Sequence, residues 1–370
     1  MMNRSMTLMM AATVSGMLGF YLLFSTVPLY AAAGGAGGFG AGLATGAMML
    51  STVLLELAVP WLLARYGYRA ALALGLVLLG VPALVLPLSS ALPVVLAVSL
   101  LRGGGLGILV VTGTALTAEL VPAERRGEGL GVYGVAVGIP SVMGLPLGLW
   151  AAGALGFTPV FLVAALVPLA GLVAVPMLPA LKARPQASSS SEHVSGLARP
   201  ILIFASVTVA TGVLVTFLPL AVSPSLASVA LLVQSICTPA ARWWAGRFGD
   251  RHGSARLLLP GLALGAAGMA LQVWPGGVIA GMVLFGIGFG LLQNATLAVM
   301  FERGAVGRVS ALWNLAYDAG MGVGAVGFGF LVGATGYGLG FVLVALVMVA
   351  ALPLVHRVSS TPTVISSPSL

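Results

Sequence analysis

The chain has 370 residues, of which 59% are hydrophobic and only 6% are charged. Soluble globular proteins carry about 25% charged residues, so this composition excludes a soluble globule and indicates an integral membrane protein. The formal net charge is +8, but the basic residues are scattered over many connectors rather than gathered on one face, which argues against nucleic-acid binding.

The apolar residues form about twelve runs, each close to the length of roughly 20 residues that a membrane-spanning helix needs. The first run is too long for a signal peptide and lacks a small-residue cleavage site. A membrane barrel is not expected, because the runs are continuous rather than alternating. We predict helices near residues 6–30, 41–64, 69–88, 92–118, 129–154, 158–179, 200–221, 224–246, 255–273, 277–300, 309–333 and 336–354.

Lysine and arginine occur in alternate connectors, and the connectors between them contain neither residue. Because basic residues are retained on the cytoplasmic side during insertion, both termini are expected in the cytoplasm and the helix count is expected to be even. The expected location is a cytoplasmic (inner) membrane of bacterial type. The basic set contains Arg4, Arg65, Arg69, Arg125, Arg126, Lys182, Arg184, Arg199, Arg242, Arg247, Arg251, Arg256, Arg303, Arg308 and Arg357.

The longest polar stretch, residues 181–200, follows the sixth run and is rich in serine. This composition is typical of a linker, so we interpret the stretch as the connection between two halves of the chain. We therefore predict an N-terminal six-helix bundle (1–180), a cytoplasmic linker (181–199), a C-terminal six-helix bundle (200–355) and a cytoplasmic tail (356–370).

A short charged segment, GRFGDRHGSAR, separates two apolar runs at residues 246–256, and a degenerate copy, PWLLARYGYR, occupies residues 60–69. Arg65 aligns with Arg251 and Gly67 with Gly253 at one common offset. The segment resembles the cytoplasmic signature loop of the major facilitator superfamily. That resemblance implies an all-α transporter with twelve membrane helices in two pseudo-repeated six-helix bundles.

In that family the signature loop acts as a conformational latch that helps to hold the outward-facing state. The resemblance carries this role to the matching residues of the second copy, Gly246, Asp250, Arg251, Gly253 and Arg256. Only Arg65, Gly67 and Arg69 remain in the first copy, where Ala64 replaces the carboxylate, so a weaker latch is expected there. Glu119 and Glu302 end the fourth and tenth runs, either as partners of Arg69 and Arg256 or as exposed carboxylates.

Three ionisable residues lie well inside apolar runs: Glu56, Arg102 and Asp318. Each costs at least about 2.5 kcal/mol at mid-bilayer, so each is expected to face the protein interior and is a candidate for proton coupling. Glu56 is interpreted as a proton carrier, a structural hydrogen-bonding group or a contact for a cationic substrate. Straight helices place Glu56 and Arg102 at different depths, which argues against a salt bridge between them.

Arg102 begins RGGGLG, which resembles the fourth-helix motif of proton-coupled family members, although Gly105 and Leu106 replace the expected Gln-Gly pair. The glycines predict either close helix packing or a ligand role. In the fifth run, Gly144 and Pro146 loosely resemble the glycine and proline motif of antiporters, which favours export.

The eleventh run places Asn314 and Asp318 on one face and Trp313 and Tyr317 on the next. Its Tyr-Asp-x-Gly pattern resembles the eleventh helix of bacterial drug and sugar efflux members. Asp318 either binds a proton or cation or makes a helix-to-helix hydrogen bond. If the second run forms the other side of that interface, Glu56 lies near Asp318.

No nucleotide-binding loop, metal-ligand spacing or nucleophile with a base occurs, so we expect no enzyme activity, cofactor or metal. The expected function is proton-coupled export of small amphipathic or drug-like molecules by a monomer in the lipid bilayer. A proton-coupled importer, a sugar or metabolite exporter and a non-transporting receptor are the alternatives. The substrate-cavity candidates are Tyr21, Phe24, Gln234, Gln293, Asn294, Asn314 and Tyr317.

Overall fold

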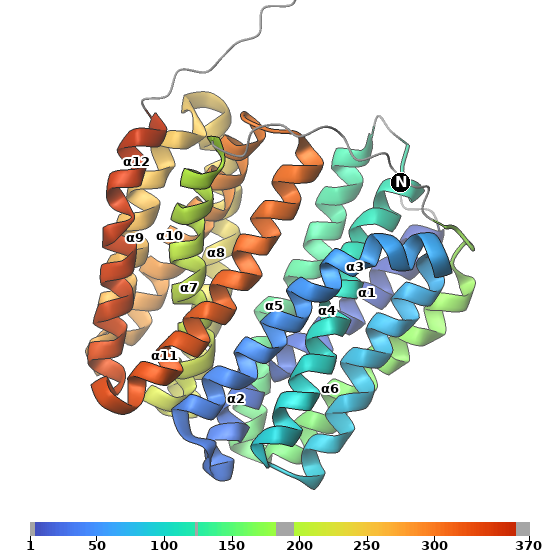
Figure 1. Ribbon diagram of the computed structural model, residues 1–370, viewed down its shortest axis with the longest axis horizontal. Helices are drawn as coiled ribbons and strands as arrows, with labels where there is room; N and C mark the ends of the chain where they lie inside the picture. Colours follow the sequence, from blue (N-terminus) through green and yellow to red (C-terminus); the bar gives the residue numbers. More distant parts are fainter. Residues whose placement is uncertain (1–3, 123–124, 183–195, 360–370) are drawn as a thin grey trace, which may run out of the picture.

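The computed structural model describes residues 4–122, 125–182 and 196–359, and nearly all of these are helical (Figure 1). Most of the predicted linker and the end of the predicted tail lie outside the described residues, as does Arg184. The side chains of Arg126 and Arg357 are also outside the description. The main helices are α1 (Arg4–Phe24), α2 (Thr26–Ala31), α3 (Gly37–Gly80), α4 (Leu92–Leu120), α5 (Arg126–Leu155), α6 (Phe157–Gly171), α7 (Ala198–Ala221), α8 (Pro224–His252), α9 (Leu258–Ala270), α10 (Val278–Phe301), α11 (Val306–Ala350) and α12 (Leu352–Ser359).

Shorter helical turns extend several of these helices. A π-helical turn, η1 (Ala32–Ala36), follows α2, and 3₁₀ turns extend α3 and α6 as η2 (Val81–Leu88) and η4 (Leu172–Met177). In the second half of the chain, η6 (Ser254–Leu257) precedes α9 and η7 (Leu271–Val273) follows it, and η8 (Pro275–Gly277) leads into α10.

Nine helical segments of the described chain are long and apolar enough to cross a membrane. Two of them fold back on themselves at glycines with positive φ, a backbone conformation that other residues rarely adopt. The segment Arg4–Leu88 turns at Gly35 and Gly37 and again at Gly67, and Arg308–Val355 turns at Gly336. Divided at these turns, the described segments make twelve passes. The all-helical fold predicted from the sequence is therefore confirmed.

The helices form two groups that lie side by side (Figure 1). In one group α1 packs against α5 and α6, and α3 packs against α4. In the other, α7 packs against α11, and α10 packs against α8 and α9. The groups meet where α3 contacts α11 and where α5 contacts α8. The boundary between the groups is therefore formed mainly by these four helices.

The contact between α3 and α11 is closest near the ends that carry no lysine or arginine. Gly42 packs against the backbone carbonyl of Ala325, and Gly46 packs against the side chain of Val326. Close to these glycines the hydroxyl groups of Thr45 and Thr216 form a buried hydrogen bond of 2.8 Å between α3 and α7. The missing side chains let the two backbones approach, so this side of the molecule is closed.

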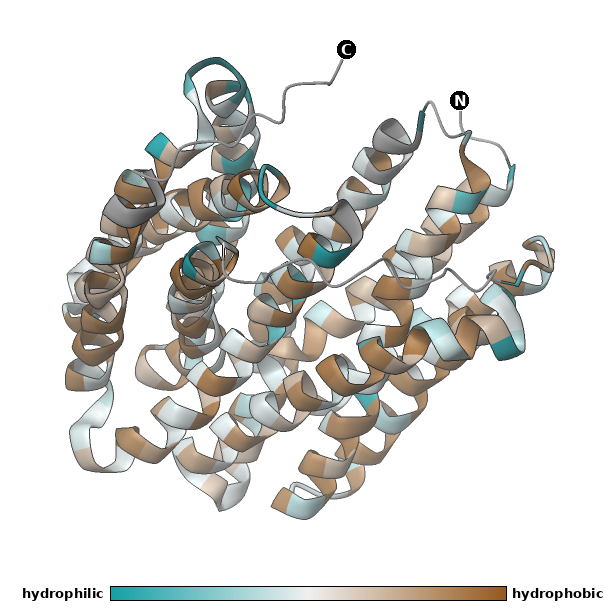
Figure 2. Cartoon of the chain, turned by 45° about the horizontal axis from the view of Figure 1, so that its top comes forward, coloured by the Kyte–Doolittle hydropathy of each residue, from teal (hydrophilic) through white to brown (hydrophobic). Residues whose placement is uncertain are grey.

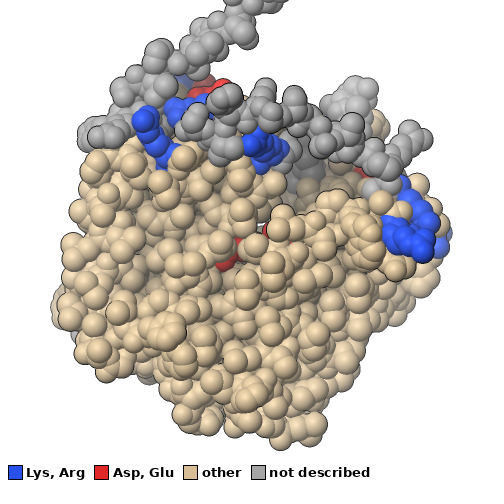
Figure 3. Space-filling model, viewed as in Figure 1, with Lys and Arg blue, Asp and Glu red and all other residues tan. Residues whose placement is uncertain are grey.

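Charged residues and apolar residues occupy different parts of the surface along the length of the helices. Figure 3 shows lysine and arginine along one edge of the molecule, and Figure 2 shows mainly apolar residues along the bodies of the helices. This division is the one that a bilayer imposes, because charged side chains are costly in its apolar core.

Candidate functional site

Two carboxyl groups face each other across the boundary between the helix groups. Glu56 lies on α3 and Asp318 on α11, each is half-buried, and their charges are close enough to interact. Figure 3 shows acidic atoms in the middle of an otherwise uncharged face between the groups. The arm of α3 that carries Glu56 forms the expected interface with α11, and Glu56 is within electrostatic reach of Asp318.

Close packing of α4 fixes the position of Glu56. A Cβ atom on Gly107 would lie 3.0 Å from the Cγ of Glu56 and 2.6 Å from the carbonyl oxygen of Thr52. Only glycine leaves enough room for α4 to pass at this level. The carboxyl group of Glu56 is thus supported on one side by α4.

Two tyrosines extend the charged site. Tyr317 lies within electrostatic reach of Tyr21, Asp318 and Arg242, and Tyr21 lies within reach of Asp318 and near the side chain of Ser141. Glycine in α5 again permits the approach, since a Cβ on Gly144 would lie 2.6 Å from the Cβ of Tyr21. The site therefore draws polar groups from α1, α3, α5, α8 and α11.

An aromatic cluster adjoins the carboxyl pair in the second helix group. Trp313 stacks on Phe204 with their ring centres 4.4 Å apart, and Tyr317 lies 5.9 Å from Trp313 and 6.1 Å from Phe289. The indole nitrogen of Trp313 donates a 3.2 Å hydrogen bond to the hydroxyl of Thr296. The ring of Trp313 is thus fixed by packing on its face and by a hydrogen bond at its edge.

Arg242 is a site residue that the sequence analysis assigned to a connector. It is exposed, and its guanidinium carbon lies 5.9 Å from the centre of the Trp313 ring. It precedes the end of α8 by several turns, so it lies beside the aromatic cluster rather than in the following loop. The one sequence signal is its place in an Arg-Trp-Trp run before the signature segment.

Arg102 is not part of this arrangement. Its side chain is completely buried and donates hydrogen bonds to two backbone carbonyls, that of Gly19 on α1 at 2.9 Å and that of Leu79 on α3. These bonds join α4 to both neighbouring helices. The sequence makes Arg102 a proton-coupling candidate, but its hydrogen bonds in the structure hold α4 against α1 and α3.

The glycines after Arg102 pack α4 between the two arms of α3. Gly103 lies against the carbonyl of Met48 before the turn at Gly67, and a Cβ on Gly105 would lie 2.8 Å from the carbonyl oxygen of Gly75 after it. The packing interpretation of RGGGLG is thereby confirmed.

The remaining cavity candidates fall into two sets. Asn314 is half-buried one helical turn before Asp318, and Asn294 is half-buried close to Gly246, where a Cβ would lie 3.4 Å from its amide nitrogen. Phe24, Gln234 and Gln293 are buried at 5%, 6% and 7% exposure. The first set is accessible to a molecule between the helices, and the second is enclosed by helix packing.

The second copy of the signature segment is exposed at the end of α8. Residues up to His252 remain helical, the chain turns at Gly253 with φ 88, and Asp250, Arg251 and Arg256 are exposed. Gly246 is the half-buried member of this set. Glu302 is exposed after α10.

The first copy is tied to the segment that follows η4. The backbone N–H of Tyr68 donates a 3.0 Å hydrogen bond to Leu181, and Arg69 donates from Nε to the carbonyl of Leu178. Gly67, at φ 82, leaves room for the same Leu181 carbonyl. Glu119 interacts electrostatically with Tyr68, and Arg65 lies over the ring of Tyr66 at 5.8 Å. The first copy is therefore braced within its own helix group.

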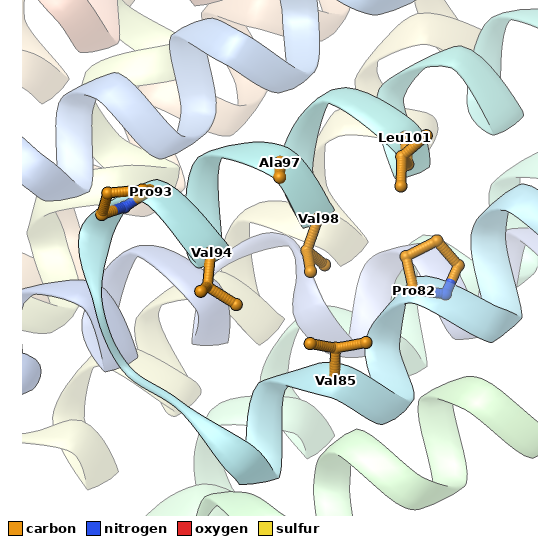
Figure 4. A pocket seen from close by; sticks show the side chains of 7 residues that line it. All are labelled: Pro82, Val85, Pro93, Val94, Ala97, Val98 and Leu101. Carbon is orange, nitrogen blue, oxygen red and sulfur yellow. The ribbon is translucent and has the colours of Figure 1, made fainter.

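A groove between η2 and α4 has a different character (Figure 4). It is lined only by apolar side chains, among them Pro82, Val85, Val94 and Leu101. It offers no polar group for orienting a substrate. Among the described residues, no group of three or more His, Cys, Asp or Glu is placed to hold a metal ion.

A helical membrane protein with a charged site between two helix groups has the architecture of a multi-pass transporter. Residues 9–223 match the family model described as Major Facilitator Superfamily, and the chain belongs to that family. It is a transporter and not an enzyme. A search of curated proteins finds no match.

Solved transporters share the fold at low sequence identity. A bacterial homolog of the human lysosomal transporter Spinster, in an inward-facing and occupied conformation, matches with a TM-score of 0.80 and 14% identity over 98% of each chain. The xylose transporter XylE from E. coli, in an inward open conformation, matches with a TM-score of 0.78 and 14% identity over 98% of this chain and 97% of that one. The nucleoside transporter NupG matches with a TM-score of 0.73 and 13% identity over 98% of this chain and all of that one.

Proposed function

We propose that this protein is a proton-coupled exporter of small amphipathic molecules that works by alternating access. The observation that carries the proposal is the pair formed by Glu56 and Asp318, which come from opposite helix groups and interact across their boundary. Two carboxylates in a water-poor site repel each other strongly, and one added proton removes that repulsion. Protonation thereby changes the energy of bringing α3 and α11 together, which is the link between proton binding and conformation that a coupled carrier needs.

The moving parts are the two predicted bundles, residues 1–180 and 200–355, which rock about the site as one monomer. The edge rich in lysine and arginine faces the cytoplasm, as retention of basic residues during insertion favours. The close packing of Gly42 and the bond between Thr45 and Thr216 then keep the external side shut. The exposed carboxylate of Asp250 is free to serve as a latch when the cytoplasmic side closes.

Export requires that substrate and proton occupy the site in turn. The half-buried pair and the adjoining tyrosines are accessible to both, which supports exchange. The eleventh-helix pattern around Asp318 supports the same direction. Import by symport is the second candidate, because one matching structure is a D-xylose–proton symporter with a TM-score of 0.77.

The direction of coupling is tested in proteoliposomes with an imposed pH gradient and three probes: naphthalene-2-sulfonate, a naphthyl trimethylammonium and xylose. The two ions carry permanent charges and the sugar carries none, so none of them redistributes passively with pH, and protein-free liposomes provide the baseline. An antiporter concentrates its substrate in the more acidic compartment, whereas a symporter concentrates it in the more alkaline one.

The carboxyl pair is tested in the same assay. Glu56→Gln and Asp318→Asn should each abolish gradient-driven accumulation while the purified proteins keep the thermal stability of the wild type. Accumulation in the alkaline compartment would support the import alternative. A protein that binds a probe but moves none under any gradient is a receptor, and the transport proposal then fails.

A further inference from the structure

The charge that a substrate carries can be inferred from the position of Arg242. The rise of 1.5 Å per residue puts this residue about 15 Å from the end of α8 at His252. Its side chain is exposed, although the neighbouring Trp313 is buried at 9% exposure. Arg242 is thus a solvent-reachable cation at the depth of the aromatic cluster.

The guanidinium group remains free to bind a ligand in this position. It lies over the ring of Trp313 at 5.9 Å and within electrostatic reach of the Tyr317 hydroxyl. At this distance the contact is a cation–π attraction and not a hydrogen bond, so the N–H groups remain available to donate two parallel hydrogen bonds to an oxyanion. Within the described structure Arg242 forms no ion pair with Glu56 or Asp318, and its electrostatic partner is Tyr317.

Arg102 cannot take this role. Its side chain is fully buried and its hydrogen bonds go to the carbonyls of Gly19 and Leu79. Of the two arginines, Arg242 is the one that a dissolved anion can reach. Of the three rings beside it, Phe204 is fully buried, Trp313 is 9% exposed and Tyr317 is half-buried, so Tyr317 is the ring that a ligand reaches most readily.

We propose that the substrate is an organic anion with a flat apolar body, whose oxyanion binds Arg242 and whose body packs against the half-buried ring of Tyr317. This inference rests on the proposed transport function and narrows it to one class of substrate. The carboxyl pair then serves the proton rather than a cationic substrate. An anion that enters also supplies the countercharge that Arg242 otherwise lacks.

The test compares binding of three naphthalenes that share a ring and differ in charge: naphthalene-2-sulfonate, a naphthyl trimethylammonium and 2-naphthalenemethanol. Binding is read as the shift in melting temperature of the purified, detergent-solubilised protein. The sulfonate should stabilise the wild type more than the alcohol does, and the cation should give the smallest shift. Binding requires no flux, so this result stands apart from the transport assay.

Arg247 supplies the matched control. It lies on the same helix and its guanidinium also stacks on a tryptophan, with 4.1 Å between the guanidinium carbon and the ring centre of Trp243. Arg247→Gln should bind the sulfonate as the wild type does. Arg242→Gln should bind it at least about tenfold more weakly, as expected for the loss of a charge-assisted pair. Arg242→Lys keeps the positive charge but not the planar guanidinium group, so its affinity for the sulfonate should lie between those of Arg247→Gln and Arg242→Gln. This variant also controls for a folding defect in Arg242→Gln.

Equal sulfonate binding by Arg242→Gln and the wild type overturns the proposal. So does a response to the cation alone, or no response to the sulfonate at all. Sulfonate binding that depends on Arg242, without gradient-driven flux, would support the anion site while counting against the transporter.

Discussion

The hydroxyl groups of Thr45 and Thr216 share a hydrogen bond of 2.8 Å, and both side chains are fully enclosed. The bond joins α3 of one helix group to α7 of the other. A buried pair of this kind contributes about 1 kcal/mol, so it biases the conformation without preventing its change. In an alternating-access carrier it has to break whenever the side without basic residues opens.

Replacing both threonines by cysteine should therefore produce a lockable gate. In a Cys237→Ser background, which removes the one native thiol, we expect Thr45→Cys and Thr216→Cys to form a disulfide on mild oxidation. Oxidation should stop gradient-driven transport and reduction should restore it. Each single cysteine variant is the control, and continued transport by the cross-linked protein would contradict a moving boundary between α3 and α7.

The glycine contact between α3 and α11 leads to a second prediction. A side chain at Gly42 would meet the backbone oxygen of Ala325, which cannot move aside as a flexible side chain can. Gly42→Val should therefore push the helices apart and slow formation of the disulfide at residues 45 and 216 by about fivefold or more, which corresponds to roughly 1 kcal/mol. Gly327→Val is the matched control, because nothing lies within 4 Å of a Cβ there. Equal cross-linking rates in the two variants would show that close approach at Gly42 is not required.

Much of this architecture could be predicted from the sequence, because a bilayer requires each span to satisfy its own backbone hydrogen bonds. The predicted runs 41–64 and 69–88 correspond to the arms of α3 on either side of Gly67, together with η2. The connector charges anticipated the basic edge in Figure 3. The costly intramembrane carboxyls, Glu56 and Asp318, were found for the same physical reason.

The neighbours of individual side chains could not be predicted. Every helix contains backbone carbonyl groups, so the sequence does not indicate which of them accept hydrogen bonds from Arg102. In the structure these are the carbonyls of Gly19 and Leu79. Arg242 was missed because it lies near the end of the predicted helix 224–246 and was counted with the arginines of the following connector, whereas α8 continues to His252. Periodicity indicates which residues share a face, but only the packing of helices determines what that face meets.

Arg102 gives a third prediction, on stability. Replacing it by methionine keeps much of its volume but removes the two charge-assisted hydrogen bonds to the carbonyls of Gly19 and Leu79, each of which contributes about 1.5 to 3 kcal/mol. We expect Arg102→Met to lower the melting temperature of the purified protein clearly, and Arg102→Lys to lower it less. A methionine variant with unchanged stability but no proton-driven transport would instead identify Arg102 as a coupling residue.

The two signature segments should respond differently to substitution. Asp250 is exposed at the end of α8, whereas Arg69 and Tyr68 tie the first copy to the segment that follows η4 within one helix group. If Asp250 completes a latch only when the cytoplasmic side closes, then Asp250→Asn destabilises that closed state and leaves the open one unchanged. The population should shift toward the arrangement described here, and the disulfide at residues 45 and 216 should form faster.

Arg65→Gln is the control from the first copy, since Arg65 lies over Tyr66. Its cross-linking rate should match that of the parent cysteine pair, and equal acceleration by both variants would contradict the asymmetry.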